Sequence, residues 1–225
     1  VKQPRRQMVC VTSKSSPLAA RAEAGEYLDA FFIDDNIGGR FSSTSAVGGV
    51  LLSLCFGADV FAQVLAGAAE ADSAALEPNV RKNAALLDAL IGVWERNFCG
   101  LAATAVLPYS QALSRFPAHL QQLDMESNGK RVNRFGEPVA YATGPIVFGE
   151  PGTNGQHSFY QLLHQGCDVV PLQFIGFMKS QSLQDAKFDG SSGQTKLNAN
   201  LLAQIVAFAL GQEHDNPNKQ FPGER

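Results

Sequence analysis

Short apolar runs that alternate with longer helical segments constrain the fold of this chain more than any other feature. Apolar runs that read as buried strands lie at residues 8–12, 30–33, 104–108, 145–148 and 168–177. Segments with helical periodicity follow them, at residues 18–27, 42–54, 58–71, 78–97, 111–123, 156–165 and 197–210. Because strands joined by helical crossovers pair in parallel, the pattern predicts an α/β fold with a mainly parallel, five-stranded sheet.

The charge balance and the apolar segments exclude two kinds of partner. The 225 residues include 18 Lys and Arg against 21 Asp and Glu, so the chain lacks the basic field that nucleic acid binding needs. The most apolar stretch, residues 46–69, is interrupted by Asp59 and Gln63, which favours a buried helix pair over a membrane span. Four widely spaced cysteines form no zinc or redox motif and are predicted to be reduced core residues of a cytoplasmic protein.

Polar segments that follow strands are the candidate sites, because ligands of parallel sheets bind beyond the carboxyl ends of the strands. The first such segment places Gly38 and Gly39 directly before Arg40. Paired glycines let the backbone approach a ligand, and an arginine near a helix start is a fixed cation for an oxyanion or a phosphate. A tight turn in which Arg40 pairs with Asp34 or Asp35 explains the segment equally well.

The second segment follows the helix predicted at 111–123 and contains Glu126 beside the Asn128-Gly129 turn. A carboxylate held at a helix end can be tuned as a base for proton transfer. Taken alone, Glu126 fits better as a solvated glutamate in a surface loop.

The third segment, residues 149–159, joins the strand at 145–148 to the helix predicted at 156–165 and contains His157. Its glycines and the helix start resemble an anion site, and a histidine in the first turn of a helix is favoured in its neutral form. A capped helix whose histidine bonds to its own loop is the alternative. His164, further along the same helix, fits equally well as a packed interior histidine.

Taken together and in order, these segments resemble the glucose-6-phosphate isomerase family. The Gly-Gly-Arg-Phe-Ser sequence at 38–42 is similar to a signature of that family. Residues 107–109, 122, 124–130 and 144–147 are similar to its central stretch, and residues 149–157 and 159–166 match it almost word for word. The resemblance covers nearly the whole chain from about residue 9.

This resemblance implies a fold and a chemistry. It implies a sugar-isomerase (SIS-type) domain over residues 1–211, built as a three-layer α-β-α sandwich, followed by a polar tail over residues 212–225. The family interconverts glucose 6-phosphate and fructose 6-phosphate in glycolysis and gluconeogenesis, as a cytoplasmic homodimer without metal or cofactor. An intramolecular oxidoreductase of this kind moves a proton between neighbouring carbons through a cis-enediolate.

The family's functional residues carry over by position. Glu126 matches its base, Arg40 the arginine that stabilises the enediolate, and His157 the histidine that helps to open the sugar ring and reaches the site from the neighbouring subunit. Gln122 and Gly39 match positions near the substrate. These roles agree with what proton transfer beside a carbonyl requires: a positioned carboxylate, a fixed cation and an acid–base group.

Segments of the family that grip the phosphate and supply an active-site lysine are not found in this sequence. We therefore expect exposed apolar surface and little or no activity from this chain alone. The alternative function is a non-catalytic sugar-phosphate-binding module of the same fold. Such a sensor needs binding groups but no proton-transfer base, so the joint presence of Arg40, Glu126 and His157 favours the isomerase.

Overall fold

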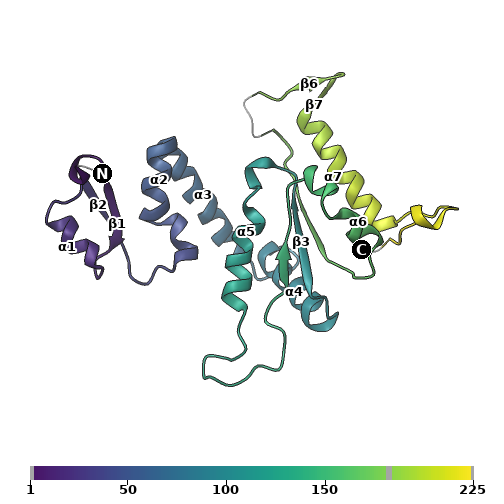
Figure 1. Ribbon diagram of the computed structural model, residues 1–225, viewed down its shortest axis with the longest axis horizontal. Helices are drawn as coiled ribbons and strands as arrows, with labels where there is room; N and C mark the ends of the chain where they lie inside the picture. The colour runs from purple at the N-terminus through teal and green to yellow at the C-terminus, as the bar shows by residue number, and fades with distance from the viewer. Residues whose placement is uncertain (1–2, 181–183, 224–225) are drawn as a thin grey trace. The chain divides into compact units, whose positions relative to one another are not determined.

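The computed structural model describes residues 3–180 and 184–223, shown as a ribbon in Figure 1. The chain divides into two compact units, an N-terminal unit, Val1–Asp88, and a C-terminal unit, Ala89–Arg225. The division falls inside helix α4 (Ala84–Val93). The boundary expected at residue 211 stays a prediction.

The N-terminal unit starts with a parallel βαβ motif, as predicted. Its elements are the 3-10 helix η1 (Pro4–Arg6), β1 (Val9–Ser13), α1 (Pro17–Glu23) and β2 (Asp29–Ile33). The two strands pair in parallel from Val9↔Asp29 to Ser13↔Ile33. Ser16 caps α1, because its hydroxyl oxygen accepts a hydrogen bond from the Leu18 amide at 3.1 Å.

A helical hairpin follows in the same unit. It comprises the 3-10 helix η2 (Gly39–Thr44), α2 (Ala46–Phe56) and α3 (Ala58–Ala75). Gly57 joins α2 to α3 with a φ of 96°, a value that favours glycine. The predicted helix pair is confirmed, but its predicted burial is wrong, since neither helix has a buried residue.

The C-terminal unit is built around a parallel sheet. Its elements are the π-helical turn η3 (Trp94–Phe98), β3 (Ala103–Pro108), η4 (Gln111–Leu113), α5 (Phe116–Leu120), the π-helical turn η5 (Gln121–Glu126), β4 (Ile146–Phe148), η6 (Asn154–His157), α6 (Tyr160–Gln165), β5 (Leu172–Ile175), β6 (Lys187–Phe188), β7 (Ser191–Ser192), α7 (Gly193–Leu210) and η7 (Pro217–Lys219). The strand order is β4-β3-β5, with β3 in the centre. β6 and β7 form a short antiparallel hairpin that the sequence did not predict.

The predicted five-stranded sheet is wrong. Each of the predicted strands forms, but among the described residues β1 and β2 make a two-stranded parallel sheet and β3, β4 and β5 a three-stranded one. Apolar runs predict where strands lie, whereas pairing depends on tertiary contacts that the runs do not encode. The mixed α/β class with parallel sheets is confirmed, and the three-layer sandwich stays a prediction.

The core of the C-terminal unit lies between β3 and the helices α6 and α7, to the right of β3 in Figure 1. It contains Ala105 and Leu107 of β3, Tyr160 and Leu163 of α6, and Phe208 of α7. His164 stacks on Phe208 with ring centroids 3.7 Å apart. The interpretation of His164 as a packed histidine is therefore confirmed.

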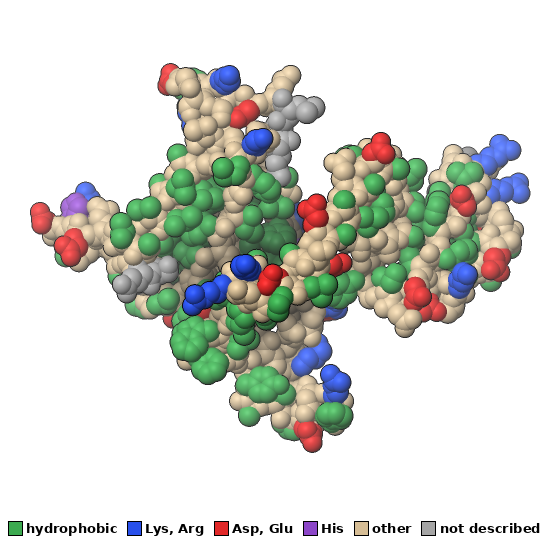
Figure 2. Space-filling view, turned by 180° about the vertical axis from the view of Figure 1, so that it is seen from behind, with side chains coloured by type: hydrophobic (Ala, Val, Ile, Leu, Met, Phe, Trp, Pro, Cys, Tyr) green, Lys and Arg blue, Asp and Glu red, His purple; other side chains and the backbone are tan. Residues whose placement is uncertain are grey.

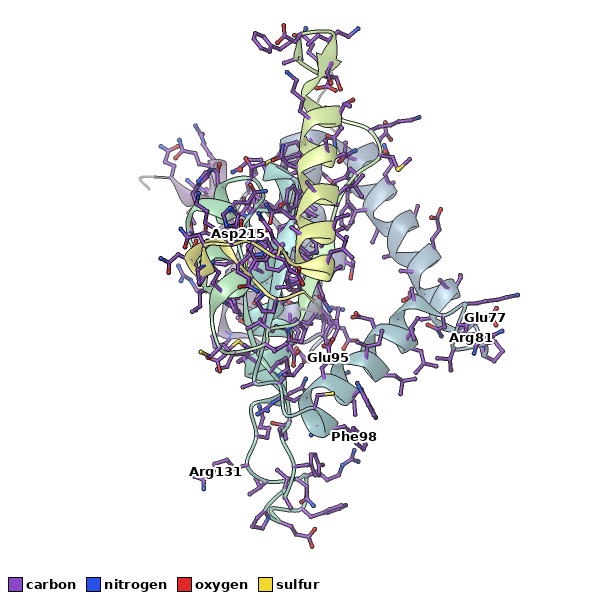
Figure 3. The ribbon with its side chains drawn as sticks, turned by 90° about the vertical axis from the view of Figure 1, so that its right-hand side faces the viewer. Glu77, Arg81, Glu95, Phe98, Arg131 and Asp215 are labelled. Atoms are coloured by element: carbon purple, nitrogen blue, oxygen red, sulfur yellow. The ribbon has the colours of Figure 1, made fainter. Side chains whose placement is uncertain are left out.

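The polar segment after α7 folds back on the unit. Gln212 and Phe221 form an antiparallel bridge, and the Phe221 ring lies 4.9 Å from that of His164. The Gln165 side-chain amide donates to the carbonyl oxygens of Asn218 and Gln220 at 3.1 and 3.0 Å. Asp215, labelled in Figure 3, lies on this segment.

Much apolar surface is exposed, as Figure 2 shows for one face of the molecule. The stripe of α4 and η3 that predicted a packed helix, from Leu86 to Trp94, is 39% to 60% exposed. Burial of this stripe is therefore a wrong prediction for this chain, whereas exposed apolar surface is confirmed.

Core placement of the cysteines is confirmed only for Cys10, because Cys55, Cys99 and Cys167 are exposed. No described helix has both the length and the apolar character needed to cross a bilayer.

Candidate active site

Glu126 is the last residue of the π-helical turn η5, and its side chain is exposed. Two bonds hold this turn against β4: the Gln121 side-chain amide donates to the Val147 carbonyl oxygen at 3.0 Å, and the Val147 amide donates to the Met125 sulfur at 3.3 Å. Single π-helical turns occur frequently at functional sites. The carboxylate is thus carried to solvent by a turn that is bonded to the central sheet.

The residues after Glu126 brace the end of this turn. The Asn128 side-chain amide donates to Asp124 Oδ1 at 2.8 Å, and the Gly129 amide donates to the Met125 carbonyl oxygen at 2.9 Å. A Cβ at position 129 would lie 2.5 Å from that carbonyl oxygen, so the turn requires glycine. Lys130 Nζ donates to the carbonyl oxygens of Glu126 and Ser127 at 2.8 and 2.9 Å, which places a cation where the turn exposes its carbonyls.

A hairpin loop connects η5 to β4, and a backbone bridge and side chains of η3 hold it in place. Its strands meet at the Val132↔Pro138 bridge, which confirms the small hairpin predicted as one alternative for this loop. Arg131, labelled in Figure 3, extends from the loop into solvent. Near β4, Arg96 Nε and the Asn97 side-chain amide, both in η3, donate to the carbonyl oxygens of Gly144 and Ala142 at 3.0 and 2.8 Å.

His157 lies at the end of the 3-10 helix η6, exposed to solvent. The expected place for it, in the first turn of a helix over 156–165, is wrong, because α6 begins at Tyr160. The helix-dipole argument for a neutral imidazole therefore does not apply. Gly155, two residues before, is buried, and its backbone amide donates a hydrogen bond to the Pro151 carbonyl oxygen at 2.9 Å.

The loop that carries His157 approaches β3 at two glycines. A Cβ at Gly149 would lie 1.8 Å from the Val106 carbonyl oxygen, and a Cβ at Gly152 would lie 2.4 Å from the Tyr109 ring. The Gly152 amide also donates to the Pro108 carbonyl oxygen at 3.0 Å. These contacts explain the glycines that the sequence interpretation assigned to anion binding: both are required by packing.

Gly39 and Arg40 lie in the N-terminal unit, at the start of η2. Ser42 Oγ donates to the Gly39 carbonyl oxygen at 2.7 Å, which closes the turn. A Cβ at Gly38 or Gly39 would meet nothing within 4 Å, and neither glycine has a positive φ. Unlike Gly149 and Gly152, these glycines are therefore not required by the packing of the described residues, and a ligand that approaches the backbone remains an explanation for them.

The two acidic residues before this turn have partners of their own. Asp34 Oδ1 accepts from the backbone and side-chain amides of Asn36, at 2.8 and 2.9 Å, and these bonds lower the pKa of Asp34. Asp35 Oδ1 accepts from Ser15 Oγ at 2.9 Å. Together they fix the segment that leads from β2 to the paired glycines.

The candidate residues are distributed over both units. Gln122 and Glu126 lie on the same turn, η5, and His157 lies on another loop of the C-terminal unit. Gly39 and Arg40 belong to the N-terminal unit. Among the described residues, no cluster of His, Cys, Asp and Glu gathers in a way that could hold a metal ion.

An open cavity of about 430 Å³ lies beside the two loops of the C-terminal unit. Its lining is mostly polar and comes from Gln111, Ser114, Arg115, Pro117, Ala118, Gln121, Gly149, Glu150, Pro151 and Asn154. It thus borders both η5 and the loop of His157. Sequence reasoning missed Arg115, and the signal that could have found it is its position in the segment after the carboxyl end of β3.

Comparisons with known proteins agree on one family. The family model for phosphoglucose isomerase matches residues 8–223. A glucose-6-phosphate isomerase of Treponema pallidum is 65% identical over 223 residues, and that of Chlamydia pneumoniae is 52% identical over 217 residues. These matches cover 99% and 96% of this chain but 41% of each relative, so the chain spans about two fifths of their length.

Solved structures are similar to this chain as well. A crystal structure of a glucose-6-phosphate isomerase from Chlamydia trachomatis is similar to this chain, with a TM-score of 0.90 and 51% identity over 96% of the chain and 41% of the structure. A Thermus thermophilus protein described as hypothetical, TT0462, has a TM-score of 0.74 and 30% identity over 90% of the chain and 49% of that structure.

Proposed function

The chain belongs to the phosphoglucose isomerase family, and we propose that it forms part of an enzyme that interconverts glucose 6-phosphate and fructose 6-phosphate. The observation that carries the proposal is the placement of Glu126, an exposed carboxylate at the end of a turn bonded to β4. A base must hold its position relative to the proton that it removes, and this turn supplies such a support.

Glu126 acts as the base in the proposed reaction. Its carboxylate removes the proton from C2 of the open-chain aldose, the electron pair of that C–H bond forms the C1–C2 double bond, and the carbonyl electron pair moves onto O1 to give the cis-enediolate. Returning the proton to C1, while the hydroxyl proton of O2 passes to O1 and the C2 carbonyl forms, gives the ketose, so no electrons leave the substrate and no cofactor is needed. A well-positioned base accounts for roughly 10²–10⁴-fold in rate.

Arg40 and His157 complete the proposed chemistry. Arg40 places its guanidinium near the enediolate oxygens and stabilises the charge that develops there. His157 moves a proton between the ring oxygen and the O1 hydroxyl and so opens the sugar ring, acting in the site of the neighbouring subunit of a homodimer. Gln122 and the open backbone at Gly39 contact the substrate.

The chain alone has little or no activity in this proposal. It spans about two fifths of the relatives that it matches, and the exposed apolar faces of α2, α3 and α4 fit with a larger folded body. The proposed enzyme works in glycolysis and gluconeogenesis in the cytoplasm.

The test measures fructose 6-phosphate conversion by a full-length polypeptide that contains this chain, with glucose 6-phosphate detected through coupled reduction of NADP. Glu126→Gln removes the base and keeps the shape, so kcat is expected to fall by roughly 10²–10⁴-fold. Glu137→Gln is the matched control, because Glu137 is an exposed glutamate of the neighbouring hairpin. A Glu126→Gln enzyme with unchanged kcat would refute the proposed base and favour a non-catalytic sugar-phosphate-binding module.

A further inference from the structure

We infer that Tyr109 is a positioning residue that fixes the loop carrying His157, an inference that rests on the proposed role of His157. Tyr109 directly follows β3 and is fully buried, although its side chain carries a hydroxyl group. A buried hydroxyl without partners is unfavourable, so the partners of this group show what it does.

One partner lies next to His157 in the chain. The Gln156 side-chain amide donates to the Tyr109 hydroxyl oxygen at 2.8 Å, and Gln156 precedes His157 in η6. The bond therefore links the short helix that ends in His157 to the end of the central strand.

The ring of Tyr109 holds the beginning of the same loop. Gly152 packs so closely on this ring that a Cβ there would lie 2.4 to 2.5 Å from three of its carbons. Beside it, the Gly152 amide donates to the carbonyl oxygen of Pro108. The end of β3 thus contacts the loop both before η6 and within it.

Tyr109 is itself supported from the core. Its hydroxyl lies 3.4 Å from that of Tyr160, and its ring packs against Phe174 with centroids 6.2 Å apart. A hydroxyl can accept one hydrogen bond and donate another. Tyr109 can therefore accept from Gln156 and donate to Tyr160, which connects the His157 loop to the hydrophobic core.

If Tyr109 positions His157, a change at Tyr109 lowers kcat by displacing His157. In the full-length polypeptide, Tyr109→Phe keeps the ring and removes the bond to Gln156, and a small displacement of an acid–base group can lower the rate by up to about 10²-fold. We expect kcat to fall by roughly 10- to 100-fold with little change in KM. Gln156→Leu removes the same bond from the loop side and is expected to reproduce the loss. Tyr141→Phe, at a tyrosine that is 66% exposed, is the matched control.

A double-mutant cycle with His157→Ala separates positioning from general damage. If Tyr109 acts through His157, then Tyr109→Phe has no further effect on kcat in the His157→Ala background. Equal losses in both backgrounds would overturn the inference. An unchanged kcat in Tyr109→Phe, together with a lowered kcat in His157→Ala, would also overturn the inference. An unchanged kcat in His157→Ala would refute the proposed role of His157 as well.

Hydrogen exchange in the 225-residue chain gives a readout that does not depend on activity. In Tyr109→Phe, amides of residues 152–158 are expected to exchange faster while those of β3 keep their protection. Unchanged exchange over 152–158 in both Tyr109→Phe and Gln156→Leu would contradict the inference.

Discussion

Gly149→Ala should destabilise the C-terminal unit more than an added methyl group usually does. The new Cβ would lie 1.8 Å from the carbonyl oxygen of Val106 and 2.8 Å from its carbonyl carbon, and Cβ atoms in proteins essentially never come within 3.0 Å of such atoms. The obstacle is backbone of the central strand, at a residue that is 1% exposed, so it cannot rotate away as a side chain could. Either β3 or the loop has to move.

The size of the effect follows from overpacking. Extra methyl groups in packed interiors cost about 1–3 kcal/mol, and an obstacle made of backbone places Gly149→Ala near 3 kcal/mol. For a chain of this length that corresponds to a fall in Tm of roughly 6–12 °C. The pairing of β3 with β4 is the interaction most directly weakened, because Gly149 directly follows β4.

Urea unfolding of the 225-residue chain, followed by circular dichroism, measures this loss. Gly92→Ala is the control: Gly92 lies in α4 of the same unit, and a Cβ there would meet nothing within 4 Å. Since alanine is favoured over glycine in helices by about 1 kcal/mol, Gly92→Ala should raise the urea midpoint. A Gly149→Ala chain within about 0.5 kcal/mol of the original, the range of ordinary surface changes, would refute the reasoning.

Two further predictions address the candidate site and the buried tyrosines. Gly39→Ala should leave the urea midpoint of the chain unchanged, because its Cβ meets open space. It should lower kcat/KM of the full-length polypeptide if the substrate approaches that backbone. A kcat/KM equal to that of the original enzyme would argue against Gly39 as a binding position. Burial and the hydrogen bond with Tyr109 raise the pKa of Tyr160, so its contribution to stability is complete below its ordinary value near pH 10 and is lost as the pH rises further. Tyr160→Phe should therefore flatten the alkaline decline of the urea midpoint, and an unchanged decline would contradict this assignment.

Local signals in the sequence predicted elements better than their pairing. The apolar runs located β1 to β5, and the helix predicted over 18–27 located α1, which Ser16 caps. Each of these signals acts within a few residues, through side-chain burial or through capping of free backbone amides. A single five-stranded sheet requires pairing between strands far apart in the chain, which the pattern does not specify, and the described residues form a two-stranded and a three-stranded parallel sheet instead.

In the candidate site, too, local signals were predictable and long-range contacts were not. The sequence predicted Glu126 just past the end of a helix over 111–123, beside the Asn-Gly turn, whereas the helical turn η5 extends to Glu126 itself. The π-helical form of that segment was not predictable from local signals, and its hydrogen bonds join Gln121 and Met125 to Val147, which lies 26 and 22 residues later in the chain. The start of α6 was misplaced because the Tyr109 hydroxyl and the close contact at Gly152 hold the preceding residues in a separate 3-10 turn.

The π-helical form of η5 makes the length of that segment as important as its composition. A π-helical turn bonds residue i to residue i+5, one residue more than an α-helical turn. Deleting one residue from Gln121–Glu126 would remove the extra residue that the π-helical turn holds and allow an ordinary α-helix. Three of the six positions in the turn are exposed and can accept other side chains, whereas an insertion or deletion would change the spacing of Gln121 and Met125, which bond the turn to β4. Natural variation in this segment should therefore consist of substitutions and spare its residue count.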